Sequence, residues 1–276
     1  MKKSFKIIMA LTLTIMLTGC GVKFGSESRN NKFNFFNINN EDVSDNNDND
    51  NLIQNVDISE EIDGINKLDI NIDVSNADIE YYDGDTIRIS GNLSKYSRGV
   101  KTEKKSNKLI IIEESKRSTN VSQDYASELT ISVPRSFNGD FEFSFGVGEC
   151  EINELELDNV TIKNGVGELT LEDISFNNLD LESGVGTVNL ETKKKTGEIT
   201  IKGGIGETNV SLGDINGNLK FDGGMGSTTI KVPVNAAIAI NSNSGLGDVK
   251  IRAKTSNEAK YNFDITVGIG EVEVTN

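Results

Sequence analysis

The sequence has no histidine and no tryptophan, and it has only two cysteines and two prolines among its 276 residues. Histidine is the commonest general base near neutral pH and the commonest protein ligand of transition metals. Its absence leaves carboxylates as the main groups available for acid–base chemistry. The sequence therefore predicts no catalytic residues, no metal site and no cofactor.

Basic residues are also scarce, because 28 Lys and Arg face 43 Asp and Glu and the formal net charge is −15. Nucleic-acid binding needs a concentrated basic face that displaces counterions from phosphates. The composition predicts no nucleic-acid partner.

The N-terminus has the layout of an export signal. Met1–Lys3 is positively charged, Ile7–Leu17 is apolar apart from threonines, and Gly19 precedes Cys20. These regions in this order are typical of a secretory signal, and the cleavage site resembles the lipobox of bacterial lipoproteins. We expect residues 1–19 to be removed and Cys20 to carry the lipid that anchors the chain to the extracytoplasmic face of the membrane. The alternative is an ordinary secretory signal with a chance cysteine.

Residues 20–57 are rich in Asn and Asp and poor in apolar residues. Such a segment cannot offset its ordering entropy, so we expect a disordered linker. Phe33, Phe35 and Phe36 are exceptions that could contact lipid headgroups or the domain that follows.

A Gly-apolar-Gly triplet recurs seven times in the second half of the chain. The differences between the numbers of successive first glycines are 19, 19, 20, 20, 21 and 23 residues. A fixed period of this length indicates the coils of a solenoid. The predicted corner glycines are Gly146, Gly148, Gly165, Gly167, Gly184, Gly186, Gly204, Gly206, Gly224, Gly226, Gly245, Gly247, Gly268 and Gly270.

Apolar residues alternate on both sides of each triplet, which is typical of strands with one buried face. They fall five and three residues before the first glycine, as at Phe141 and Phe143, and four and six residues after it. The sequence therefore predicts an all-β fold, a parallel β-solenoid (β-helix-like) with about 19–23 residues per coil. Before Gly245 we expect a two-residue displacement, with Ile238 and Ile240 in the inward positions.

This register makes two further predictions. The outward residues Lys163, Glu182, Lys202 and Asp222 should stack as alternating charges on successive coils. Cys150 falls in an inward row otherwise filled mainly by Leu and Val, so we expect it to be buried and inert rather than a reactive thiol.

The solenoid should span residues 58–276, with a less regular part over 58–134 and the repeats over 135–276. Asp83–Asp85 is expected to form a hairpin or a coil turn. The chain stops two residues after the inward Val274, and an uncovered strand edge is a pairing surface. We expect this edge to be covered by a partner, by another copy through self-association, or by an earlier part of the chain.

Several short motifs resemble one family. They are DVSNADIEY at residues 73–81, DGD at 83–85, IRI at 87–89, LTISVP at 129–134 and the Gly-x-Gly-acidic corners. The order of these motifs, over residues 58–276, is similar to their order in the adhesin-like, or toastrack, domain of bacterial cell-envelope proteins. The resemblance implies a β-solenoid outside the membrane that is used for contact or envelope-stress sensing.

Two functions are consistent with these patterns. The first is a non-catalytic binding or scaffolding module in the cell envelope, whose partner is an envelope protein or a cell-wall polymer. The alternative is a polysaccharide-acting enzyme, because β-helices carry such sites on exposed carboxylate rows. The carboxylates available for it are Glu149, Glu168, Glu207, Asp248 and Glu271.

A basic stretch stands out in the acidic chain, and it consists of Lys95, Arg98, Lys101, Lys104, Lys105 and Lys108. It could contact an anionic lipid or wall polymer, at about 1 kcal/mol per charge near an anionic membrane. The alternative is a solvated loop between strands.

Overall fold

The computed structural model describes residues 54–116 and 126–276, and every regular element in these residues is a β-strand. In this part of the chain no helix is long and apolar enough to cross a membrane. Cys20 and most of the predicted linker lie outside the described residues, so their roles stay predictions. The first strand, β1 (Gln54–Glu61), begins four residues before the predicted domain boundary at residue 58.

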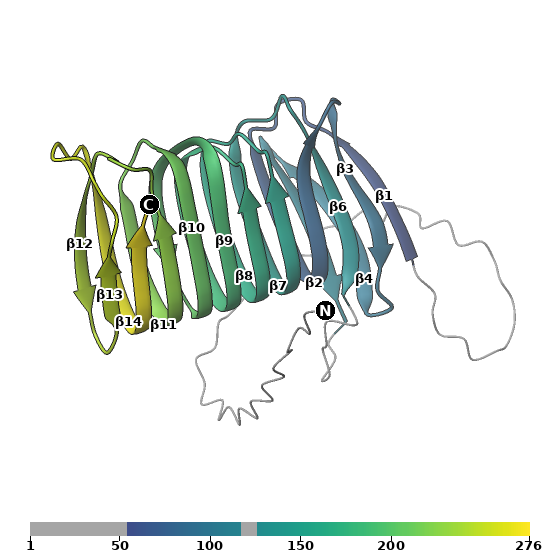
Figure 1. The fold of residues 1–276 in the computed structure, drawn as a ribbon. Coiled ribbons are helices and arrows are strands. Elements are labelled where there is room, and N and C mark those ends of the chain that lie inside the picture. Colours follow the sequence, from purple (N-terminus) through teal and green to yellow (C-terminus); the bar gives the residue numbers. More distant parts are fainter. Residues whose placement is uncertain (1–53, 117–125) are drawn as a thin grey trace, which may run out of the picture. The chain divides into compact units, whose positions relative to one another are not determined.

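All the strands of the described residues belong to one 14-stranded sheet that winds along the domain (Figure 1). The first part of the chain forms β1, β2 (Lys67–Tyr82), β3 (Thr86–Leu93), β4 (Ser97–Lys105), β5 (Lys108–Ser115) and β6 (Ser127–Pro134). The repeats form β7 (Asp140–Asn153), β8 (Asn159–Glu172), β9 (Phe176–Lys202), β10 (Ile205–Ile215), β11 (Leu219–Lys231), β12 (Ile238–Ser244), β13 (Asp248–Ile251) and β14 (Tyr261–Thr275).

The repeats stack in parallel with matching residues side by side, which confirms the solenoid. Gly148 pairs with Gly167, Gly167 with Gly186, and Gly206 with both Gly186 and Gly226. The strands run through most of the triplets without interruption, since β7, β8 and β9 each contain theirs. Each coil thus contains two strand arms joined at a glycine corner.

The N-terminal end of the sheet is antiparallel, which the repeat period did not predict. The strand β2 pairs in parallel with β7 on one side and with β5 and then β6 on the other. Beyond them, β3 pairs antiparallel with β6, β1 with β3, and β4 with β5. Because β6 lies between β2 and β3, the Asp83–Asp85 segment is a connecting turn and not a two-strand hairpin.

The spatial order of the last coils differs from their order in the sequence. The C-terminal strand β14 pairs with β11 on one side and with β12 and β13 on the other. In Figure 1, β14 accordingly lies between β11 and the pair β12 and β13. Of the expected covers for the C-terminal strand, an earlier part of the chain is the one found. The edge of the solenoid is therefore formed by β12 and β13, and not by the last strand.

Ile238 is buried and Ile240 packs against the core, as expected, but the expected two-residue displacement before Gly245 is wrong. Ile240 pairs with Phe263 and Ser242 with Ile265, so β12 keeps the common register and a serine takes one inward position. Ser242 is exposed because no further coil covers β12, and a polar side chain is tolerated there for the same reason.

Stacked apolar rows fill the interior of the coils. The first arm contributes Leu68, Phe141, Val160, Leu179, Ile199, Leu219 and Phe263, all buried, and a second row runs from Ile70 through Phe143 to Phe221. A third side closes each coil with residues that the alternation analysis did not single out, namely Leu155, Ile174, Thr192, Leu212 and Val232. Each row leaves water only when neighbouring coils cover it, which makes stacking the source of stability.

Candidate binding surface at the glycine corner

The corner is built from two columns of glycine that no other residue can replace without movement. A Cβ on Gly186 would lie 1.9 Å from the carbonyl oxygen of Gly167, and a Cβ on Gly167 would lie 1.8 Å from that of Gly148. Both residues also have φ of +137°, a conformation that side chains disfavour. The glycines therefore allow successive corners to approach within hydrogen-bonding distance while the chain turns.

The inward direction switches across each triplet, and this places its middle residue outside. Before each triplet, inward side chains lie an odd number of residues from the first glycine, as Phe145 does from Gly146. After the triplet they lie an even number of residues from it, as Cys150 does. The residue between the glycines is left pointing toward solvent, since Val166, Val185, Ile205, Met225 and Ile269 are 45 to 52% exposed. The apolar residue of the triplet is thus a surface residue.

These middle residues form a continuous apolar stripe, which we call the corner ridge. It consists of Val147, Val166, Val185, Ile205, Met225, Ile269 and Leu246. From Val147 to Ile269, adjacent members are strand neighbours and so lie about 4.8 Å apart, whereas Leu246 lies in the bend between β12 and β13. Leu246 is the most exposed at 83%, and its amide donates to the carbonyl of Gly268, beside Ile269. A contiguous apolar patch on a folded domain usually marks a contact surface.

An acidic row runs beside the corner ridge, two residues further along each coil. In spatial order it consists of Glu149, Glu168, Thr187, Glu207, Ser227, Glu271 and Asp248. Lys250 lies against this row and its Nζ is 2.5 Å from Glu271 Oε1, which raises the pKa of Lys250 through the hydrogen bond and charge of that carboxylate. The surface therefore combines an apolar stripe with a parallel line of negative charge.

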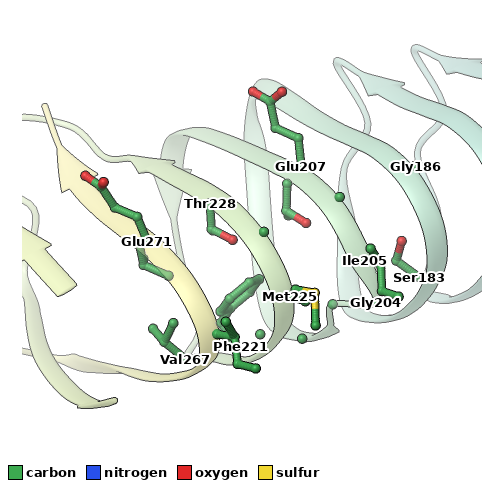
Figure 2. A pocket seen from close by; sticks show the side chains of 18 residues that line it. Ser183, Gly186, Gly204, Ile205, Glu207, Phe221, Met225, Thr228, Val267 and Glu271 are labelled. Atoms are coloured by element: carbon green, nitrogen blue, oxygen red, sulfur yellow. The ribbon is translucent and has the colours of Figure 1, made fainter. Parts of the chain in front are cut away.

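Two members of the acidic row, Glu207 and Glu271, also line the small cavity at this corner. The cavity at this corner, lined by Gly203, Gly204, Phe221 and Val267 among others, has a volume of about 20 Å³, enough for about one water. Figure 2 shows Glu207 and Glu271 projecting from separate coils, with Ile205 and Met225 beside the glycines. Within residues 54–116 and 126–276, no group of three or more acidic, Cys or His residues is arranged to hold a metal ion.

Cys150 is buried, as the register predicts. It is 3% exposed and lies between Ala77 and Leu169 in the inward row of the second arm. Burial raises the pKa of its thiol to about 12, outweighing the hydrogen bond with the Ala77 backbone, and the charge of Asp78 adds to the rise. The thiol is therefore protonated at physiological pH, which keeps it unreactive.

The stack of alternating charges also has the expected register. Lys163 pairs with Glu182, and Lys202 with Asp222. The Lys202 Nζ lies 3.1 Å from Glu182 Oε1, and this hydrogen bond and charge raise the pKa of the lysine. These groups are exposed, so their contribution to stability is small.

Most of the predicted basic stretch is paired with carboxylates. The Nζ atoms of Lys101, Lys104 and Lys105 lie 3.2, 3.2 and 3.0 Å from Glu114, Glu60 and Glu103. Lys95 lies over the ring of Tyr96. These ion pairs reduce the positive charge offered to a partner, and contact with an anionic surface stays a prediction for Lys95, Arg98, Lys101, Lys104, Lys105 and Lys108.

Lys108 belongs to an ion-pair cluster that joins three strands. It contacts Asp69 of β2, and its Nζ lies 3.4 Å from Glu142 of β7, which also binds Lys67 at 2.7 Å. Partial burial would raise the pKa of Glu142, but the two lysines outweigh it and hold the pKa below its usual range. Lys108 therefore acts in strand pairing.

One buried carboxylate was not found from the sequence. Glu113 is 1% exposed, accepts a 2.6 Å hydrogen bond from Ser97 Oγ, and accepts another from the Asp73 amide at 3.2 Å. It lies where β2 changes partner from β5 to β6. Burial raises the pKa of Glu113 although these hydrogen bonds oppose the rise. Its role is to satisfy backbone groups at the gap between two strands.

Comparison with known proteins fits this architecture. The family model described as Toastrack DUF4097 matches residues 65–274, or 210 of the 276 residues. The chain belongs to this toastrack family. The match spans β2 to β14, so the glycine repeats and all of the antiparallel end except β1 lie within the family's range.

Two solved structures are similar to this toastrack chain. A proposed adhesin from Bacteroides fragilis NCTC 9343 is 17% identical with a TM-score of 0.50, covering 80% of this chain and 96% of its own. A proposed cell-adhesion protein from Clostridium sporogenes ATCC 15579 is 15% identical with a TM-score of 0.37, covering 81% and 99%. At 17% identity the likeness to the Bacteroides fragilis protein concerns the fold alone. No curated protein matches the chain.

Proposed function

We propose that this toastrack protein is a non-catalytic binding module of the cell envelope, and that the corner ridge with its acidic row is the contact surface. The observation that carries the proposal is the set of half-exposed apolar side chains held in register by glycines. A rigid backbone presents these groups without the ordering cost that a flexible loop would have. The partner we propose is an envelope protein or a cell-wall polymer, contacted in adhesion or stress sensing.

The N-terminal sequence supports a place for this module. The signal-like residues 1–19 and the lipobox-like Cys20 fit a lipid anchor on the extracytoplasmic face. The acidic linker that follows would keep the toastrack domain near the membrane without fixing its orientation. A Cys20→Ala chain should be released into the medium or remain unprocessed, while its domain folds normally. Membrane retention of processed Cys20→Ala protein would contradict the anchor.

The geometry favours binding over polysaccharide cleavage. Glycosidic cleavage by two carboxylates requires them to flank one bond, about 5 to 9.5 Å apart, in a site that holds the sugar. Glu149 and Glu168 are neighbours on adjacent coils, but the row is interrupted by Thr187 and Ser227 and follows an open edge. Hydrolysis of cell-wall polymers by the purified chain, lost in Glu149→Gln, would reverse this preference.

Cosedimentation with isolated cell envelopes tests the contact surface. A chain with Ile205→Ser and Met225→Ser should bind envelopes more weakly, because both side chains are exposed and their loss leaves the core intact. The control is Val234→Ser, which removes an exposed apolar side chain away from the ridge. Equal binding by the ridge variant and the control would refute the ridge as the contact surface.

A further inference from the structure

Among the strands that the structure describes, the outermost one at the C-terminal end of the solenoid has an edge that no other strand covers. β12 ends the path of hydrogen-bonded strands and pairs with β14 alone. Its other side presents backbone donors and acceptors of a strand that runs from Ile238 to Ser244. Such an edge is a template for pairing with another strand.

The edges at the two ends of the domain differ in charge. At the N-terminal end, β1 carries Asp57, Glu60 and Glu61, and five of the nine residues of β4 are charged. Charged side chains on an edge strand oppose pairing with another chain. The seven residues of β12, Ile-Ala-Ile-Asn-Ser-Asn-Ser, carry no charge. Among the described edge strands, only β12 lacks charged residues that oppose pairing.

The side chains of β12 suit continued stacking. Asn189 and Asn209 are joined rung to rung by a 3.0 Å hydrogen bond, and Asn159 and Asn178 by one of 2.8 Å. Asn241 starts a similar contact, because its Nδ2 donates to Asp264 Oδ1 at 2.9 Å. An amide has further donor and acceptor capacity, so a second strand can extend the ladder.

Incomplete burial at the same end adds an apolar contribution. Ile251 of β13 follows the inward row that contains Val274, yet it is 47% exposed, whereas Val274 is fully buried. The difference arises because Val274 has a coil on each side and Ile251 has one. A further layer on the terminal coil would remove this apolar surface from water.

From these observations we infer that the β12 edge is a self-association surface, where β12 of a second copy pairs antiparallel with it to form a two-fold dimer. A second copy is favoured over a charged partner because the edge is neutral, and two identical neutral strands meet without like-charge repulsion in a chain of net charge −15. A two-fold pairing uses the same strand from both copies, so it closes and does not propagate. Because the edge strands at the N-terminal end are charged, each copy has only one end that pairs with another copy.

Disulfide cross-linking in membranes of cells that produce the full chain tests this pairing. The two-fold brings the outer face of one β12 beside the outer face of the other, so one residue of the strand lies opposite itself, at a distance that a disulfide spans. Single cysteines are placed at each of residues 239 to 243. Cys150 gives no background, because it is buried within the described domain.

We expect a covalent dimer at one of these positions, formed about ten-fold or more faster than with Asp57→Cys in the edge strand β1, because pairing raises the effective thiol concentration. Ala239→Lys or Asn243→Lys, at whichever of the two positions does not carry the cysteine, should abolish dimer formation because it places like charges across the two-fold axis. No species larger than a dimer should form. Absence of a dimer at all five positions, an equal rate at Asp57→Cys, or a ladder of larger species would overturn the inference.

Discussion

Replacing Gly186 by alanine tests how the corner is built. Its Cβ would lie 1.9 Å from the Gly167 carbonyl oxygen and 2.8 Å from the carbonyl carbon. A Cβ atom essentially never lies within 3.0 Å of another heavy atom of this kind, so one coil must move by more than 1 Å relative to the next. The +137° φ of Gly186 adds strain of about 1–3 kcal/mol, and each inter-coil hydrogen bond lost adds about 1 kcal/mol.

We therefore expect Gly186→Ala to lower the free energy of unfolding by about 3 kcal/mol or more. For a domain of this size the melting temperature should fall by about 6–12 °C, measured by circular dichroism. Gly203→Ala is the matched control, because its Cβ would lie 3.4 Å from the Gly224 nitrogen and its φ is not in the left-handed region. Its expected change is within about 0.5 kcal/mol. Equal melting temperatures for the two variants would refute the reasoning.

Three further changes test the interior. Phe143→Ala should cost about 3–5 kcal/mol in urea unfolding, because the ring is fully buried and packs 5.6 Å from the Phe145 ring; a cost below about 1 kcal/mol would contradict this packing. Cys150 should react with a thiol reagent at pH 9 only after denaturation, since burial raises its pKa to about 12, and labelling of native protein would contradict its burial. Burial also raises the pKa of Glu113, so the native state binds a proton more tightly than the unfolded state does. The free energy of unfolding should therefore fall as pH rises from the ordinary glutamate pKa through the raised one. Glu113→Gln should remove this pH dependence, and an unchanged dependence would exclude Glu113 as its origin.

The period of the glycine triplets was sufficient to predict the solenoid, the inward rows and the burial of Cys150. Those features depend on contacts between equivalent residues of neighbouring coils, which a repeat specifies directly. The position of β14 was not predicted, because the repeat does not state which coil lies next to which. Burial explains it afterwards. Phe263, Ile265 and Val267 fit a coil covered on both sides, whereas Ser242 and Ser244 of β12 fit the exposed end.

The corner ridge was also missed, although each of its residues stood inside a recognised motif. Val, Ile and Met between two glycines are apolar, which indicates burial. The alternation pattern does not assign these residues to either face, because the inward positions switch there from odd to even distances from the first glycine. These side chains face solvent because the backbone turns at the glycines on either side of them. Glu113 was missed for a related reason, because its partners Ser97 and Asp73 are remote in sequence. The first contact follows from the antiparallel pairing of β4 with β5, and the second from the parallel pairing of β2 with β5.

The most direct test of the proposed contact surface is the affinity of the full chain for isolated envelopes, compared between the ridge variant and its matched control. The account predicts that Ile205→Ser with Met225→Ser weakens binding by about ten-fold or more, which corresponds to about 1.4 kcal/mol. Val234→Ser should bind as the unchanged chain does, and both variants should keep its melting temperature. Undiminished binding by the ridge variant, or an equal loss in the control, would contradict the account.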